Sequence, residues 1–317
     1  MIPNRAIAAW RGRKPWRTDA QVAQDLLLSA VAIEIAKHPV TGRALLWRGG
    51  TCLHQLHLQE PGRYSEDLDY VLLAGTADYR QLDDAFAEIA GTVGAAPVRP
   101  EKGAERYKIH FADAFAGGRI EIKIEINTRD AAPRFDPITL DLTVEVPAWY
   151  VGSAAVPTYC AAELVGTKFR AIAEREKGRD LWDLDLARTR LRIGDDDLAD
   201  AAAHYLAHRR ISPAEFRQRL GAHLASHAFV TDVVPLLAAP DGYDPISVGQ
   251  RVTLWTDRHL DCRLPNHEQR RSITAAGETI RCPSYELRDG TFARCAHETT
   301  DRRPCPQHPD TLVLTVW

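Results

Sequence analysis

Residues 47–73 read WRGGTCLHQLHLQEPGRYSEDLDYVLL, and this stretch decides which fold the sequence predicts. Its end is a short apolar run, typical of a buried strand. Asp67 and Asp69 lie two apart at the start of that strand, so both carboxylates project from one face, while Leu68 and Tyr70 project from the other. Two carboxylates on one face repel unless a cation lies between them, and magnesium suits oxygen ligands of this kind. A solvated start of a strand is the alternative for an isolated Asp-x-Asp pair.

Two further features favour a site over a solvated strand. Gly49 and Gly50 lie between a predicted strand and a predicted helix beginning near Thr51, where a phosphate could approach the backbone and the helix N-terminus. A plain strand-to-helix turn is the alternative. Downstream, residues 119–127 alternate isoleucine with polar residues, so Glu125 lies on the polar face of a strand and could supply a third carboxylate. Glu121 competes for this role, and an exposed sheet face explains both.

Composition limits the possible partners. The chain has 317 residues, 45% of them hydrophobic, enough for one large or two modest domains. Its formal net charge of −3 provides no global basic field for nucleic acid. Local basic patches occur at residues 1–17, interleaved with Trp10 and Trp16, and at residues 168–192. A solvated surface or a frayed terminus explains these patches as well as RNA contact does.

The pattern along the chain predicts an α+β fold, in which a mixed sheet with flanking helices is followed by a helical domain and a small irregular or β-rich appendage. The expected helices and strands are listed by residue number: helices 21–37, 78–93, 159–174, 181–192, 195–209 and 212–225, and strands 68–73, 107–111, 119–127 and 139–147. Residues 146–157 are interpreted as a junction, and RVTLW, TIRC and TLVLTVW beyond residue 241 as β-like runs. The predicted domains are therefore 1–150, 151–240 and 241–317.

The order Gly-Gly, Asp-x-Asp and a later acid resembles the DNA-polymerase-β-like nucleotidyltransferase superfamily. Within it, residues 47–73 resemble the AbiEii toxins of type IV toxin–antitoxin systems, which carry GGT, a similar gap, and Arg-x-Ser-x-Asp-Leu-Asp. A second block, ELVGTKFRAIAEREKGRDLWDLDLA at 163–187, resembles another signature of that family. Two motifs in the right order cover about residues 40–190.

The resemblance implies a role for each matching residue. Asp67, Asp69 and Glu125 would hold Mg²⁺ on a nucleoside triphosphate, and Glu125 would also help to deprotonate the acceptor. The residues implied to bind the nucleotide are Gly49, Gly50, Thr51, Ser65 and Lys168. Phosphorylation of Ser65, two residues before Asp67, would repel that nucleotide and is a regulatory hypothesis.

The resemblance also gives catalytic roles to Lys168 and Asp183. Lys168 is unusual here, because the chain uses 33 arginines and only seven lysines, and a compact ammonium can neutralise a triphosphate. A solvated helix lysine is its alternative. Asp180 is predicted to cap the next helix, with Asp183 at its third position. Asp180 and Arg179 are interpreted as scaffolding or phosphate contacts.

The implied activity is transfer of a nucleoside monophosphate to RNA, notably the 3′ end of tRNA, which would block translation in a toxin controlled by an antitoxin encoded nearby. Two alternatives stay open: nucleotidyl transfer to a protein or small molecule, and a non-catalytic partner-binding module on the same fold. The first would label a different acceptor fraction. The second predicts that removal of Asp69 leaves any growth phenotype intact.

The remaining features concern cysteines and location. Cys295, His297, Cys305 and His308 could ligate zinc, but their spacing fits no zinc-finger pattern and no Cys-x-x-Cys pair is present, so free thiols are expected instead. The N-terminus lacks the apolar core of a signal peptide, and no apolar run approaches the length of a membrane span. A cytoplasmic protein without membrane contact is therefore the expectation.

Overall fold

The computed structural model describes residues 1–261 except 59, 104, 129–131 and 240–241, together with the short segments 280–281, 285–288, 291–294 and 298–299. The described residues divide into two compact units. The first contains the described residues within 1–128, 137–158 and 287–292, and the second contains those within 132–136, 159–286 and 293–299.

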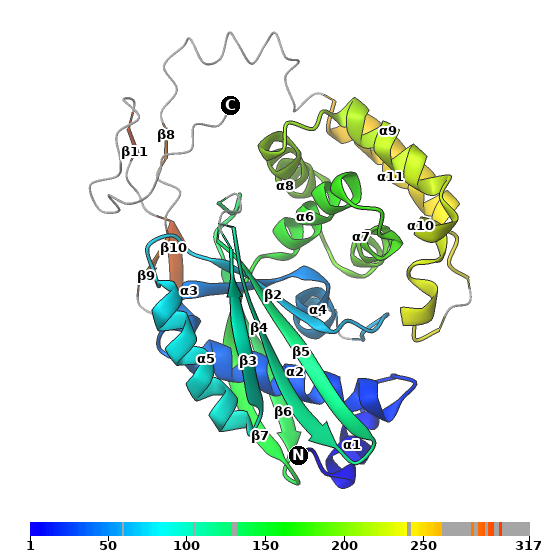
Figure 1. Cartoon of the computed structure of the whole chain (residues 1–317). Coiled ribbons are helices and arrows are strands. Elements are labelled where there is room, and N and C mark those ends of the chain that lie inside the picture. The colour runs from blue at the N-terminus through cyan, green and yellow to red at the C-terminus, as the bar shows by residue number, and fades with distance from the viewer. Residues whose placement is uncertain are drawn as a thin grey trace. The chain divides into compact units, whose positions relative to one another are not determined.

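A mixed sheet forms the centre of the first unit, and it has seven strands within the described residues, in the order β3-β4-β5-β2-β1-β7-β6 (Figure 1). The pairs β2–β5 and β1–β7 are parallel, and the other neighbours are antiparallel. The strands are β1 (Leu45–Arg48), β2 (Asp67–Leu72), β3 (Ala96–Lys102), β4 (Arg106–Phe115), β5 (Gly118–Asn127), β6 (Ile138–Val146) and β7 (Tyr150–Thr158). The predicted mixed sheet is confirmed, and β6 lies at one of its edges.

The interpretation of residues 146–157 as a junction is wrong. Most of this segment is β7, which pairs with β6 along its length and meets β1 where Trp47 faces Thr158. The small residues Gly152, Ala154 and Ala155 gave the segment the composition of a linker, but the two neighbouring strands satisfy its backbone hydrogen bonds. Strand β3 was also missed by the sequence reading.

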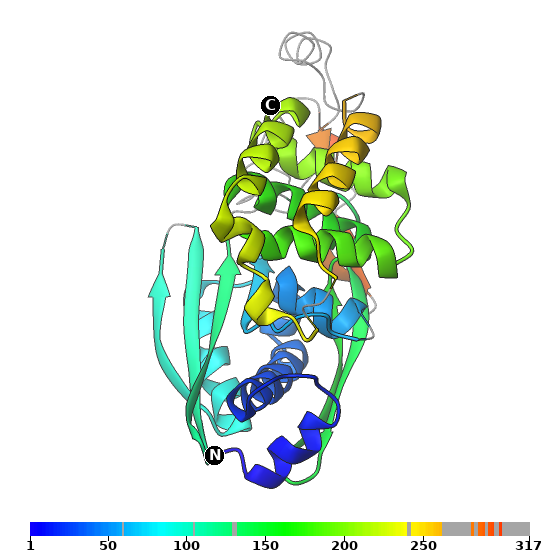
Figure 2. The same ribbon diagram turned by 90° about the vertical axis from the view of Figure 1, so that its right-hand side faces the viewer.

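Two long helices cover one face of the sheet (Figures 1 and 2). Helix α2 packs on β5, β6 and β7, and α5 packs on β3 and on α2. Both begin with a reciprocal cap, Thr18 with Gln21 in α2 and Asp78 with Gln81 in α5, which satisfies backbone amides that would otherwise lack partners. The helical segments of this unit are α1 (Asn4–Arg11), α2 (Asp19–Lys37), α3 (Thr41–Ala44), α4 (Gly49–Cys52), the π-helix η1 (Leu53–His57) and α5 (Tyr79–Val93).

The basic N-terminal segment is folded rather than frayed. Trp10 of α1 and the following Trp16 are both buried, and their indole N–H groups donate to the two carboxylate oxygens of Asp25, at 2.7 and 2.9 Å. Gln55 of η1 donates to the same carboxylate at 2.8 Å. Burial of both rings removes them as stacking surfaces for RNA, and the shared carboxylate ties α1 and α2 to η1.

The described part of the second unit is mainly helical. Helix α6 packs on α7, α8 and α9, and α11 packs on α7 and α9. Phe169 lies at the centre, with its ring 5.4 Å from that of Phe216 and 5.2 Å from that of Trp255. The elements are α6 (Ala161–Glu174), α7 (Gly178–Arg190), α8 (Asp195–His208), α9 (Pro213–Leu224), α10 (His227–Thr231), the 3₁₀ turn η2 (Val234–Leu236) and α11 (Pro245–His259).

The interpretation of RVTLW as a β-like run is wrong, because residues 251–255 lie within α11. Val248, Val252 and Trp255 are buried and recur at helical spacing, so packing overrides the local strand preference of valine and threonine. Beyond α11, β9 (Tyr285–Arg288) pairs with β10 (Thr291–Arg294), and β8 (Ile280–Arg281) with β11 (Glu298–Thr299). The TLVLTVW run and the four candidate zinc ligands lie outside the described residues.

None of the helices in the described part of the chain combines the length and apolar character needed to cross a bilayer.

Candidate active site

The carboxylates of β2 stand on one face of the sheet, as the alternation predicts. Leu68 and Tyr70 are buried, whereas Asp67 and Asp69 are only partly so. The ring of Tyr70 stacks on that of Trp47, its register partner on β1, with 6.2 Å between ring centroids. This apolar packing fixes the side on which Asp67 and Asp69 lie.

Strand β5 brings a third carboxylate beside them. In the parallel pairing of β2 and β5, Asp69 is the register partner of Glu125, and Asp67 is the partner of Lys123. Glu121 precedes the first residue of β5 that pairs with β2, and one of its carboxylate oxygens lies 2.6 Å from a ring nitrogen of His110 on β4 instead. The register therefore favours Glu125 over Glu121 as the acid beside Asp69.

A lysine that the sequence reading missed lies among these acids. The Nζ of Lys123 is 2.9 Å from an oxygen of Asp67 and 3.7 Å from an oxygen of Glu125. Burial lowers the pKa of Lys123, but the neighbouring carboxylates outweigh burial, so the pKa is raised and the ammonium stays charged at neutral pH. Arg106 adds a second contact to Glu125, at 3.2 Å. We call the face of the sheet that carries Asp67, Asp69 and Glu125 the carboxylate face. Lys123 and Arg106 already bring positive charge to it.

Asp69 carries the electrostatic cost of this arrangement. Burial raises its pKa above the usual value. Arg48 and Lys123 act in the opposite direction, but Asp67 and Glu125 add to the rise. The raised pKa means that the folded protein disfavours the ionised form of the Asp69 carboxyl group. A cation bound beside Asp69 would stabilise that ionised form.

Gly49 is required where it lies. Its φ of +87° is in the left-handed region, and a Cβ at this position would meet a carboxylate oxygen of Asp69 at 2.5 Å. The first glycine of the motif thus lets the backbone lie directly against the second aspartate.

Replacement of Gly49 by alanine is expected to destabilise the protein and to displace Asp69. Gly75→Ala is the matched control, because Gly75 has a φ of +73° but no heavy atom within 4 Å of an added Cβ. The control should lose only the cost of the left-handed backbone, about 1–2 kcal/mol. Urea unfolding of both variants should show a larger loss for Gly49→Ala, and equal losses would contradict the packing argument.

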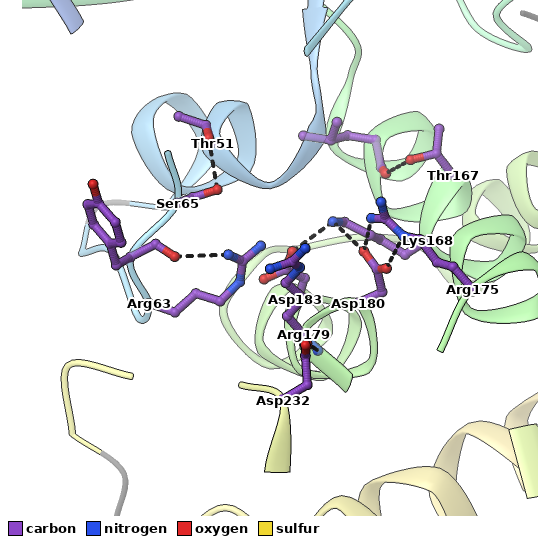
Figure 3. A network of polar contacts seen from close by, with 12 residues as sticks. Thr51, Arg63, Ser65, Thr167, Lys168, Arg175, Arg179, Asp180, Asp183 and Asp232 are labelled. Carbon is purple, nitrogen blue, oxygen red and sulfur yellow. Dashed lines mark hydrogen bonds and ion pairs between the residues drawn. The ribbon is translucent and has the colours of Figure 1, made fainter. Parts of the chain in front are cut away.

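The helix after the glycines begins two residues earlier than expected. It starts at Gly49 as α4 and continues from Leu53 as the π-helix η1, a form often found at functional sites. The hydroxyl of Thr51 donates to that of Ser65 at 2.8 Å, so the segment before β2 is bonded to the helix (Figure 3). The predicted nucleotide-binding residues Gly49, Gly50, Thr51 and Ser65 therefore belong to one connected region.

The side chains of the carboxylate face fit a magnesium ion in chemistry. They provide oxygen donors from Asp67, Asp69 and Glu125 on neighbouring strands, and the Lys123 ammonium stands where a cation is favoured. Among the residues that the structure describes, no group of three or more His, Cys, Asp or Glu side chains is already arranged around a common metal position.

The second predicted group, Lys168 with Asp183, lies in the second unit and is buried. The Nζ of Lys168 is 2.7 Å from an oxygen of Asp183 and 3.1 Å from an oxygen of Asp180, and its side chain is 4% exposed. Figure 3 shows the three side chains with Arg175 as one network. Lys168 is therefore a buried ion-pair partner rather than a solvated helix lysine.

Asp180 is not the helix cap that the sequence predicts. Helix α7 begins at Gly178, so Asp180 lies in its first turn, and its two oxygens accept from Arg175, at 2.7 and 2.9 Å, as well as from Lys168. An aspartate near the start of a helix can serve either as a helix cap or as an ion-pair partner. The sequence alone does not distinguish these two roles for Asp180. The backbone N–H of Arg179 donates to Asp232 at 3.2 Å, which agrees with a scaffolding role.

The ion pairs of Asp180 predict how the stability of the folded protein depends on pH. Burial raises the pKa of Asp180, but Lys168 and Arg175 outweigh burial, so its pKa lies below the usual value. A depressed carboxyl pKa contributes stability above the unfolded value, about 3.9, and this stability is lost as pH falls through the folded value. Asp180→Asn should therefore unfold at lower urea than the wild type at pH 7, with a difference that shrinks below about pH 4.

Asp257→Asn is the matched control, since Asp257 forms an ion pair with Arg217 on the surface. Its urea midpoint should change little at either pH. A constant difference between wild type and Asp180→Asn from pH 7 to pH 3 would contradict the coupling of Asp180 to Lys168 and Arg175.

The first unit has a mixed sheet with acids on adjacent parallel strands beside a Gly-Gly turn, and the second unit is mainly helical. These features are typical of nucleotidyltransferases. The sequence model of the family described as "Nucleotidyl transferase AbiEii toxin, Type IV TA system" matches residues 37–240, and the chain belongs to this family. Membership implies an enzyme that uses a nucleoside triphosphate and has an antitoxin partner.

Two solved structures share the fold at low identity. MenT4, a nucleotidyltransferase toxin of Mycobacterium tuberculosis, matches with a TM-score of 0.52 and 16% identity over 85% of this chain and 97% of its own. JHP933 from Helicobacter pylori matches with a TM-score of 0.51 and 15% identity over 83% of this chain and 100% of its own. No curated protein matches the sequence.

Proposed function

We propose that this protein transfers a nucleoside monophosphate from a triphosphate to an RNA acceptor, the 3′ end of tRNA, and thereby blocks translation. The observation that carries the proposal is the direct pairing of Asp69 with Glu125, with Gly49 packed against Asp69. That arrangement joins a carboxylate face to a glycine turn at which a triphosphate can approach the backbone.

In the proposed mechanism the residues of the carboxylate face and of the glycine turn have different roles. Asp67, Asp69 and Glu125 would hold Mg²⁺, which when bound stabilises charge on the phosphates. Gly49, Gly50, Thr51 and Ser65 would hold the triphosphate. When Mg²⁺ binds, Lys123 would lose its contact with Asp67, which becomes a metal ligand. The Lys123 ammonium would stay on the carboxylate face, because Glu125 also attracts it.

The transfer itself forms one bond and breaks one. The acceptor hydroxyl oxygen bonds to the α-phosphorus, and the bond from that phosphorus to the bridging oxygen of the β-phosphate breaks, so pyrophosphate leaves. The hydroxyl proton passes to a carboxylate, for which Glu125 is the candidate. The family resemblance adds catalytic roles for Lys168 and Asp183, whose side chains form an ion pair at 2.7 Å.

Exposed basic residues of the second unit support an RNA acceptor. Lys177, Arg190 and Arg192 are exposed and flank the two ends of α7. Side chains of this type bind phosphates without regard to sequence. They suit a long polyanion better than a protein or a neutral metabolite.

The test uses triphosphates labelled at either the α- or the γ-phosphate, incubated with Mg²⁺ and separated RNA, protein and small-molecule fractions. We expect the α-label, and not the γ-label, in the tRNA fraction. Periodate oxidation of the tRNA, which destroys the 3′-terminal diol, should abolish labelling. Label in the protein or metabolite fraction would instead favour the alternative acceptors, and no label in any fraction would favour a binding module.

A further inference from the structure

Lys123 stands on the carboxylate face because of the side-chain pattern of β5. Along this strand the isoleucines at positions 120, 122, 124 and 126 are buried, and the residues between them are exposed or partly exposed. Turning Lys123 to the other face would require a shift of one residue, which would bring the four isoleucines to the exposed side. The strand therefore holds the Lys123 side chain on the same face as Glu125.

The ammonium of Lys123 bridges two acids on neighbouring strands. Asp67 of β2 is the register partner of Lys123, and Glu125 follows Lys123 by two residues on the same face. The distances from Nζ are 2.9 Å to an oxygen of Asp67 and 3.7 Å to an oxygen of Glu125. All three side chains are partly buried, so water and salt screen these contacts less than those of fully exposed ion pairs. One positive group thus joins the first and third acids of the proposed magnesium site.

Glu125 has a positive group near each of its two carboxylate oxygens. One oxygen is 3.2 Å from a guanidinium nitrogen of Arg106, and the other is the oxygen that lies 3.7 Å from Lys123. A carboxylate attracts a divalent ion less strongly when cationic side chains already neutralise its charge. The carboxylate face therefore offers less negative charge to metal ions than three carboxylates alone would.

This balance of charge bears on the number of metal ions. Sites that catalyse in-line displacement at phosphorus often hold two divalent ions about 3.5–4 Å apart, one for the attacking oxygen and one for the leaving oxygen. A second ion on this face would have to share Asp67 or Glu125 with the ammonium, and the like charges would repel. The ammonium is tethered to β5, so its effective concentration beside these acids stays high whatever the metal concentration in solution.

We propose that the carboxylate face binds one divalent ion rather than two, and that the Lys123 ammonium takes the place of the second ion. The inference rests on the proposed function, because it concerns the metal site of that reaction. Lys123 is a positioning residue in this scheme. It supplies a fixed positive charge beside Glu125, the candidate proton acceptor, after Asp67 has become a metal ligand.

Binding of Mn²⁺ to the full chain, without triphosphate or RNA, tests the number of ions. Mn²⁺ takes the same oxygen ligands as Mg²⁺, and electron paramagnetic resonance measures how much of it stays free. The wild type should bind one ion per chain. Lys123→Met should bind a second ion and should bind the first about tenfold more tightly, because a positive charge beside the ion has been removed.

Two variants serve as controls for this titration. Lys123→Arg keeps the positive charge, so its ion count should equal that of the wild type. Arg119→Met removes a positive charge from the same face of β5, four residues away, where the Arg119 side chain is 67% exposed and lies 3.7 Å from Glu121. Its affinity for Mn²⁺ should change less than about twofold, because water and salt screen an exposed charge.

Thermal unfolding gives a second readout that does not depend on counting ions. Without the ammonium, Asp67 and Glu125 repel each other, so Lys123→Met should unfold at a lower temperature than the wild type in the presence of a chelator. Mn²⁺ should raise the thermal midpoint of Lys123→Met more than that of the wild type, because tighter and more numerous bound ions stabilise the folded state further.

Any count other than one ion in the wild type would overturn the proposal, and so would the absence of a second ion in Lys123→Met. A second ion in Lys123→Arg would trace the effect to the shape of the side chain rather than its charge, and would overturn it as well. A protein that transfers no nucleotide to RNA, but gains the second ion in Lys123→Met, would support the role of Lys123 and refute the proposed function separately.

Discussion

Asp69→Asn is expected to reduce nucleotide transfer by on the order of 10³-fold, the scale seen when one group that stabilises transition-state charge is removed. Asp69 lies at the centre of the carboxylate face, beside its register partner Glu125 and against the backbone of Gly49. The amide keeps the shape of the side chain but cannot bring a negative charge to the Mg²⁺ ion of the proposed mechanism. Transfer of α-labelled nucleotide to tRNA measures the loss, and growth after induction measures it in cells.

The same substitution, Asp69→Asn, should leave the stability of the protein unchanged or increase it. Because the pKa of Asp69 is raised in the folded state, the unfolding free energy falls as pH rises from the unfolded value, about 3.9, through the folded one. The asparagine variant escapes this cost, so its thermal midpoint at pH 7 should equal or exceed that of the wild type. An inactive variant that is also less stable would indicate a structural role for Asp69 instead.

Glu66→Gln is the matched control. Glu66 is exposed and lies just before β2, in the same Glu-Asp-Leu-Asp run as Asp67 and Asp69 but outside the strand that carries them. Its loss of charge should leave transfer within about threefold of the wild type, in line with a solvated side chain. If Asp69→Asn were as active and as inhibitory to growth as Glu66→Gln, a binding module would replace the enzyme as the explanation of the phenotype.

The sequence predicted those elements whose signals are local. Alternation along residues 119–127 and the two-residue spacing of Asp67 and Asp69 predicted the correct faces of β5 and β2, because side-chain direction in a strand depends only on spacing. The helical patterns that begin at residues 21, 78 and 212 placed three helix starts within two residues of those in the structure, which are Asp19, Tyr79 and Pro213.

The parts that sequence missed depend on register or on tertiary packing. Lys123 is found beside Asp67 only once β5 is aligned with β2, although the rarity of lysine that singled out Lys168 applies to Lys123 equally. The strand β7 has a linker-like composition, and α11 contains a strand-like run whose helical form is set by the packing of Trp255 on Phe169. Local patterns carry no information about these partners.

Lys168→Met is expected to lower the unfolding free energy by about 3–5 kcal/mol, because removal of one partner leaves buried charges uncompensated. Methionine keeps much of the length of the side chain but none of its charge, so Asp183 loses its 2.7 Å ion pair and Asp180 keeps only Arg175. Loss of activity in this variant would then mix a stability effect with a catalytic one, unlike the loss in Asp69→Asn. Urea unfolding at pH 7 measures the difference.

Lys177→Met is the control for Lys168→Met, since the Lys177 side chain is 47% exposed and lies 3.7 Å from Asp232. It should cost no more than about 1 kcal/mol. The double variant Lys168→Met with Asp183→Leu removes both members of the buried pair, so it should regain part of the stability lost in Lys168→Met alone. A double variant less stable than Lys168→Met would mean that Asp183 stabilises the fold through groups other than the lysine. A regain of stability without a regain of transfer would separate the ion pair's contribution to folding from its contribution to catalysis.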